Sequence, residues 1–86
     1  MPTLRQLQYL VALADLRHFG RAAQASHVSQ PSLSQQLRAL EQRLGTALVD
    51  RGSTSVELTP IGREIVARAR EVLVAVEDMR ELARRA

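Results

Sequence analysis

Leucines that recur at helical spacing constrain the fold more than any other feature of the sequence. They follow one another at steps of four, three and four residues, at Leu33, Leu37, Leu40 and Leu44. This period predicts an α-helix with one buried face. Ser29 suits its N-cap and Pro31 suits its first turn, where a missing N–H costs nothing. Gly45 is a suitable C-cap, because glycine readily takes the left-handed conformation that ends many helices.

The face opposite the leucines is short and polar. It offers Gln30, Ser32, Ser34, Gln35 and Arg38, and no carboxylate stands on it before Glu41. Glutamine can bond adenine edges, arginine can bond guanine, and serine can serve either partner. Short side chains also let the helix backbone approach a surface closely. The pattern favours a helix that enters a DNA groove; the alternative is an ordinary solvated face.

The positive charge lies in the first half of the chain. The net charge is +3, and the whole excess of Arg over Asp and Glu lies in residues 1–51. Residues 16–40 contain Arg17, Arg21 and Arg38 but no acidic residue. Such a stretch suits a polyanionic partner, although chance in a short sequence would also produce it.

Three further helices and a ribbon are predicted around this element. Thr3 can cap a first helix that runs to about Arg17, and Gly20 starts a short second helix through Ala25. The break between them is His18–Gly20, where Phe19 should enter the core and His18 could cover it. Residues 48–51 and 56–58 flank "GSTS" and predict a two-stranded ribbon. Thr59 and Pro60 then open a long last helix.

The order helix, helix, helix, ribbon, long helix defines the expected fold class. It is mainly α: a winged helix-turn-helix of three helices and a two-stranded wing, followed by a long C-terminal linker helix. We expect residues 1–59 to form the DNA-binding domain and residues 60–86 the linker helix. In helix-turn-helix units the second helix of the pair places its N-terminal residues against base edges in the major groove.

The ordered motifs resemble a known family over essentially the whole chain. They are "RAA" in the second helix, "SQPSLSQQLRALE" in the third, "LG" at its end, and an Arg followed by a short wing and "LTPIG". Together they are similar to the N-terminal domain of LysR-type bacterial transcriptional regulators. Within that family, "YLVALADLRHF" and "HVSQPSLS" are most similar to the peroxide-sensing members. The resemblance implies a domain that binds double-stranded DNA as a dimer.

The resemblance also implies roles for individual residues. The base-reading positions would be Gln30, Pro31, Ser34 and Gln35, with Ser32 and Arg38 as phosphate or base partners. Arg21 would hold a phosphate, and Arg51 with the wing residues Ser53, Thr54 and Ser55 would meet the DNA backbone or minor groove. Two positions depart from the family: Thr54 replaces the usual Arg or Lys of the wing tip, and Gly20 stands where Ser or Thr often caps the second helix.

The last helix carries a second apolar pattern. Steps of four and three connect Ile65, Ala69, Val72, Val76, Met79 and Ala83. This is the a/d spacing of a helix pair. A helix this long cannot bury its whole stripe against so small a core, so we expect a homodimer through this seam. The alternative is that the helix folds back on its own domain.

Several function classes find no support in the sequence. There is no cysteine, and two histidines alone do not make a metal site, so we expect no metal, no cofactor and no enzyme activity. No signal peptide or transmembrane run is visible, which predicts a cytoplasmic protein. The resemblance implies an imperfectly palindromic operator, and a small-molecule or redox effector acting only through a C-terminal domain that this chain lacks. The rival interpretation is a winged helix used as a protein-interaction module.

Overall fold

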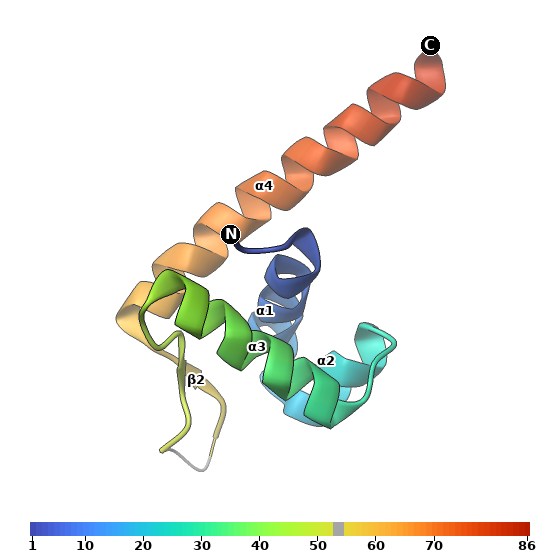
Figure 1. Cartoon of the computed structure of the whole chain (residues 1–86). Coiled ribbons are helices and arrows are strands. Elements are labelled where there is room, and N and C mark those ends of the chain that lie inside the picture. Colours follow the sequence, from blue (N-terminus) through green and yellow to red (C-terminus); the bar gives the residue numbers. More distant parts are fainter. Residues whose placement is uncertain (53–54) are drawn as a thin grey trace.

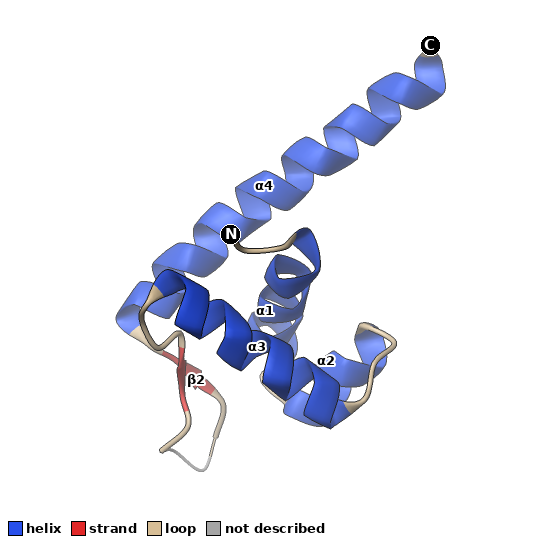
Figure 2. Ribbon diagram, viewed as in Figure 1, coloured by secondary structure: helices blue, strands red, loops and turns tan. Residues whose placement is uncertain are grey.

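The computed structural model describes residues 1–52 and 55–86. Within those residues the fold is mainly helical, with one antiparallel two-stranded sheet (Figures 1 and 2). The elements in chain order are α1 (Leu4–Leu16), α2 (Phe19–Ala25), α3 (Gln30–Leu44), β1 (Val49–Asp50), β2 (Glu57–Leu58) and α4 (Pro60–Arg85). Helices α1 to α3 form a compact body, the ribbon leaves one end of it, and α4 runs out beyond it. The predicted winged helix-turn-helix with a long last helix is therefore confirmed.

Local capping sets most of the helix starts. Thr3, Ser29 and Thr59 each accept a hydrogen bond from the amide three residues later, which satisfies one of the free donors of a first turn. Helix α3 ends at Gly45, whose φ of 73° is left-handed, as predicted. The predicted ribbon is also present, and Val49 pairs with Leu58.

The start of α2 differs from the prediction. The helix begins at Phe19, and its N-cap is His18, whose Nδ1 accepts from the Arg21 amide at 3.0 Å. The prediction that Gly20 opens this helix at the cap position was therefore wrong, because an imidazole nitrogen two residues earlier supplies the capping acceptor. Helix α1 ends one residue sooner than expected, where Arg17 turns into the left-handed region at φ 50°.

Side chains from all three body helices form the core. Leu10 and Leu13 of α1 are fully buried, as are Leu33, Leu37 and Leu40 of α3, and Ala22 and Ala23 let α2 approach them closely. Phe19 packs against this core but is only half-buried. One predicted core residue was wrong: Leu44, the last residue of α3, is 37% exposed because it lies one turn beyond the last leucine to reach the core.

A single carboxylate joins the wing, defined here as residues 49–58, to α3. Glu41 Oε2 accepts from the amides of Leu48 at 2.7 Å and Val49 at 3.1 Å, while its Oε1 pairs with Arg51 at 2.6 Å. Its side chain is 11% exposed. Burial raises the pKa of the Glu41 carboxyl, but the hydrogen bonds from Leu48, Arg51 and Val49 outweigh it, so the pKa lies below its ordinary value.

The junction between wing and α4 leaves no room for a side chain at Gly62. The Thr59 amide donates to the Leu48 carbonyl at 3.0 Å, and the Thr59 hydroxyl accepts from the Gly62 amide at 3.0 Å. A Cβ added to Gly62 would lie 2.1 Å from the Leu48 carbonyl oxygen. The glycine therefore allows α4 to start directly against the wing.

Helix α4 divides into a packed part and a free part. Its first part packs against α1, and Arg70 of α4 pairs with Asp15 of α1 at 2.6 Å. Ala69 is only 2% exposed, and Ile65 packs against the core. Its own domain therefore leaves Ala69 little surface for the predicted seam with a second chain, whereas Ile65 is half-buried, and the seam itself stays a prediction. None of the described helices is both long enough and apolar enough for a membrane crossing.

The close contact at Gly62 predicts that replacing this glycine with alanine destabilises the fold, which is the opposite of the usual effect in a helix. In a helix interior, Gly→Ala normally stabilises by about 1 kcal/mol. Here the Cβ would meet a backbone carbonyl, so Gly62→Ala should lower the free energy of unfolding by about 1–3 kcal/mol. Urea unfolding at fixed protein concentration measures this, with the exposed Ala67→Gly as a calibration of helix propensity in α4. A more stable Gly62→Ala protein would contradict the described junction.

The lowered pKa of Glu41 predicts a pH dependence of stability. A carboxyl with a depressed folded-state pKa stabilises the fold above its unfolded pKa, about 4.3, and that contribution disappears as the pH falls through the folded value. Glu41→Gln should cost about 1 kcal/mol at pH 7 and less at pH 3. Chemical unfolding at both values measures this, with the exposed Glu64→Gln as control. An equal loss at both pH values would show that the charge on Glu41 is not what holds the wing.

Candidate nucleic-acid interface

The polar face of α3 looks onto the wing across an open groove. Gln30, Ser34 and Arg38 stand four residues apart, so they form one row along the helix. They line a space of about 320 Å³ that we call the wing groove, together with Phe19, Asp50, Arg51, Ser55 and Val56. The structure thus brings five of the predicted DNA-binding residues to one groove: Gln30, Ser34, Arg38, Arg51 and Ser55.

Three other predicted residues lie around the first turn of α3. Pro31 and Gln35 are exposed on the row next to Gln30, outside the wing groove lining. Ser32 belongs to the cap network, because its amide donates to the Ser29 hydroxyl at 3.2 Å and its own hydroxyl accepts from Ser29 at 3.0 Å. The Ser32 hydroxyl keeps its proton available for a further acceptor.

The arginines of this surface differ in how they are paired. Within residues 1–52 and 55–86, no carboxylate lies within ion-pair distance of Arg21 or Arg38, and both are exposed. Arg51 differs, because Glu41 already holds it at 2.6 Å. Asp50 also lines the wing groove, where its charge opposes an anion. Arg21 and Arg38 are therefore the predicted contacts with an uncompensated charge.

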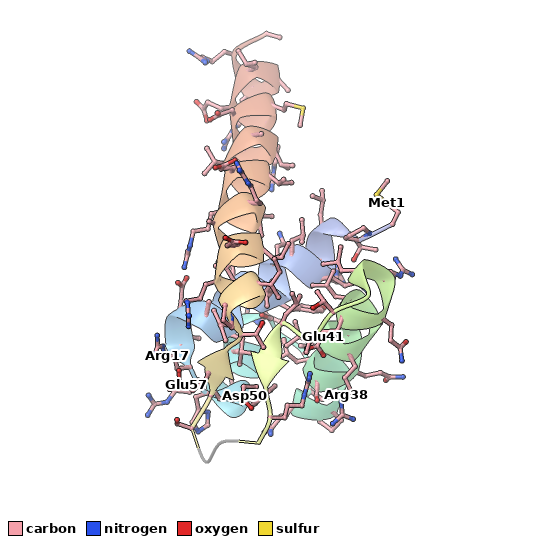
Figure 3. The ribbon with its side chains drawn as sticks, turned by 90° about the vertical axis from the view of Figure 1, so that its left-hand side faces the viewer. Met1, Arg17, Arg38, Glu41, Asp50 and Glu57 are labelled. Carbon is pink, nitrogen blue, oxygen red and sulfur yellow. The ribbon has the colours of Figure 1, made fainter. Side chains whose placement is uncertain are left out.

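Of the three predicted wing residues, the structure describes Ser55. Ser55 is exposed, and its hydroxyl lies 3.3 Å from Glu57 Oε1. The predicted contacts Ser53 and Thr54 lie outside the residues that the structure describes. In Figure 3 the labelled Arg38, Asp50 and Glu57 lie at the wing end of the molecule, opposite the free end of α4.

A second groove lies beside the first and contains residues that sequence reasoning missed. It occupies about 420 Å³ between the start of α2 and the wing, and we call it the cap groove. Its lining is Arg17, His18, Phe19, Gly20, Gln30, Ser55 and Val56. Arg17 stood in the acid-free stretch 16–40, but only the left-handed turn at Arg17 and the cap at His18 bring these side chains to the surface of α3.

Sequence comparison with known proteins finds helix-turn-helix regulators that match this chain. The family model described as "Bacterial regulatory helix-turn-helix protein, lysR family" matches residues 4–63. The chain is 46% identical over 84 residues to the HTH-type transcriptional regulator EstR of Acinetobacter baylyi, covering 98% of this chain and 28% of that protein. It is 51% identical over 80 residues to the DNA-binding transcriptional dual regulator OxyR of Escherichia coli, covering 93% of this chain and 26% of OxyR.

A solved structure of similar length carries the same fold. The BenM_DBD/benA site 1 DNA complex superposes with a TM-score of 0.92 at 37% sequence identity, covering 96% of this chain and 93% of that one. The chain spans little more than a quarter of the length of the two curated regulators above. Its motifs, its fold and the match over residues 4–63 agree, so the chain belongs to the lysR family of bacterial regulatory helix-turn-helix proteins.

Proposed function

We propose that this chain binds double-stranded DNA sequence-specifically and serves as the DNA-binding part of a bacterial transcriptional regulator. One observation carries the proposal: the exposed face of α3 is free of acidic residues from Gln30 to Leu40, and it adjoins a wing groove in which Arg38 has no ion-pair partner among the described residues. Such a face is suited to base edges and phosphates and poorly suited to an apolar protein surface.

The residues divide by the kind of DNA contact that their chemistry allows. Gln30, Pro31, Ser34 and Gln35 stand at the N-terminal half of α3, the part of a recognition helix that meets base edges. Arg21, Arg38 and Ser32 would contact phosphates or, for Arg38, a guanine. Arg51 and the wing would follow the adjacent backbone, with part of the Arg51 charge already offset by Glu41.

The relatives support this assignment. The BenM_DBD structure, similar to this chain over nearly its whole length, was solved as a DNA complex, and EstR and OxyR are named as transcriptional regulators. Signal sensing by a small molecule or a redox change would belong to the three quarters of those proteins that this chain does not match, and action in the bacterial cytoplasm follows from a target in the nucleoid.

The free part of α4 supports a homodimer. Val72 is 41% exposed, Met79 60% and Leu82 61%. With Ala75 and Ala86 they recur at steps of three and four, the spacing of a paired helix, and Val76 and Ala83 flank the same stripe. The seam predicted from the sequence contained Val72, Val76, Met79 and Ala83, and the exposure of Leu82 adds this residue to the proposed stripe. We propose that this stripe pairs with α4 of a second copy, which would present two α3 helices to an imperfectly palindromic operator.

The proposal separates residues that read sequence from residues that hold phosphate. Gln35→Ala should relax the preference at one base position in each half-site and cost about 1–3 kcal/mol on the best site. Gln42→Ala is the matched control, since Gln42 lies two turns further along α3, away from the N-terminal residues that meet bases. Selection of bound sequences from random duplexes measures the preference. An unchanged motif for Gln35→Ala would remove this residue from the readout.

Arg21→Ala should act on every sequence alike. Losing one phosphate contact lowers affinity uniformly and reduces the slope of log affinity against log salt by about 1. Titrations between 50 and 200 mM salt, over which the Debye length falls by about half, measure the slope on two unrelated duplexes. Loss of affinity on one duplex alone would show that Arg21 reads bases instead.

The proposed dimer is tested by two substitutions of the same type. Val72 belongs to the stripe, whereas Val74, 59% exposed, lies on the opposite side of α4. Val72→Glu would bury an unpaired carboxylate between two helices, at a cost of several kcal/mol, while Val74→Glu stays in water. Analytical ultracentrifugation should find Val72→Glu monomeric and helical, and Val74→Glu dimeric. A dimeric Val72→Glu protein would place the dimer contact on another surface.

A further inference from the structure

The imidazole of His18 is held in one orientation by the first turn of α2. The residue has extended backbone angles, φ −154° and ψ 118°, and its Nδ1 lies 3.0 Å from the Arg21 amide nitrogen. Because Nδ1 accepts this hydrogen bond, it carries no proton, and the neutral ring must carry its proton on Nε2. The cap therefore selects the tautomer as well as the position of the ring.

Gly20 provides the space in which the ring lies. A Cβ at Gly20 would stand 3.0 Å from His18 Cε1 and 3.3 Å from its Nδ1, which is tighter than ordinary carbon contacts. The Nδ1–Cε1 edge thus faces α2, and a side chain at position 20 would crowd the ring in its present place. Gly20 and His18 together perform the capping that a serine or threonine performs in many helices.

The other edge of the ring is free to meet a ligand. His18 is exposed, and its Nε2 is a separate nitrogen from the Nδ1 that caps the helix, with no hydrogen-bond partner among the described residues. The ring lines the cap groove with Arg17, Gln30 and Ser55, and no acidic residue is among the described residues that line it. A proton donor beside an arginine in an acid-free groove is suited to an anion. The groove also shares Gln30 with the wing groove, which places this donor next to the proposed DNA surface.

We propose that His18 donates its Nε2–H to a DNA phosphate, as a neutral hydrogen-bond donor positioned by Gly20. This inference rests on the proposed function. It does not use the Arg21 amide, which His18 already occupies. Arg17 supplies the positive charge in the same groove, and the directional hydrogen bond from His18 would orient the phosphate.

A neutral hydrogen-bond donor and an arginine differ in how the binding that they support depends on salt. Neutralising a phosphate with a cation releases counterions, whereas a hydrogen bond from a neutral imidazole releases none. Removing the His18 contact should therefore weaken binding equally at every salt concentration. Removing Arg21, in contrast, should change the salt slope.

Serine separates the two roles of His18. His18→Ser keeps an N-cap acceptor and removes the outward donor. At pH 8 it should melt like the wild type and bind a mixed-sequence duplex about tenfold more weakly, with an unchanged salt slope. His18→Ala should lose affinity to the same degree and also melt at a lower temperature. Fluorescence anisotropy with residues 1–86 and a labelled duplex, together with circular dichroism melting, measures all three proteins.

A double-mutant cycle tests the role of Gly20. Gly20→Ala should weaken duplex binding about tenfold in the wild type by displacing the ring, and should have no effect on affinity in the His18→Ser background. Long-range proton–nitrogen correlation spectra at pH 8 report the tautomer directly, and His27 serves as the internal comparison. A protonated Nδ1 on His18 would overturn the inference.

The outcomes distinguish this inference from the proposed function. If the wild type does not bind duplex DNA, the proposed function fails and this inference fails with it. If the wild type binds and His18→Ser binds equally well, only this inference is wrong, and His18 acts as a helix cap alone. If His18→Ser lowers the salt slope like Arg21→Ala, the residue acts as a cation and the neutral-donor assignment is wrong.

Discussion

The hydrogen bonds of the Glu41 carboxylate fix the wing relative to α3. Its two oxygens bind the amides of Leu48 and Val49 and the guanidinium of Arg51, which lie immediately before and at the start of the wing. The Leu48 carbonyl in turn receives the Thr59 amide, and Gly62 packs against it. One acidic residue on α3 thereby ties the beginning of the wing to this helix and, through Leu48, to the start of α4. The position of the wing beside the proposed DNA surface depends on these bonds, although Glu41 does not line the wing groove.

The arginines differ in whether an acidic residue of the same chain pairs with them. Arg51 and Arg70 form ion pairs that connect elements, α3 with the wing and α4 with α1. Arg68, Arg80 and Arg84 pair with glutamates on the exposed surface of α4. Arg17, Arg21 and Arg38 have no such partner among the described residues: Arg38 lines the wing groove, Arg17 lines the cap groove, and Arg21 is exposed on α2. The net charge is only +3, but it can still produce a locally basic surface, because many of the acidic residues pair with other arginines.

Much of the fold could be predicted because its signals are local. Ser29 with Pro31, and Thr59 with Pro60, mark helix starts by capping chemistry that depends on neighbouring residues only, and the leucine spacing of α3 reports its buried face. The His18 cap could not be predicted, since it depends on the left-handed turn at Arg17 and on the space above Gly20. Periodicity likewise showed that Ile65 and Ala69 are apolar positions of α4, but it cannot tell whether the same chain or a second chain covers them.

The central claim is that the N-terminal half of α3, the start of α2 and the wing form one DNA-contacting surface. Titration of nitrogen-15-labelled protein with a short mixed-sequence duplex, followed by amide chemical shifts, tests it most directly. The largest changes should fall on His18 to Arg21, Gln30 to Arg38 and Ser55, while the amides of Met79 to Arg85 on the free part of α4 stay unchanged on addition of DNA. Shift changes confined to α4, or no changes at any duplex concentration, would contradict the account.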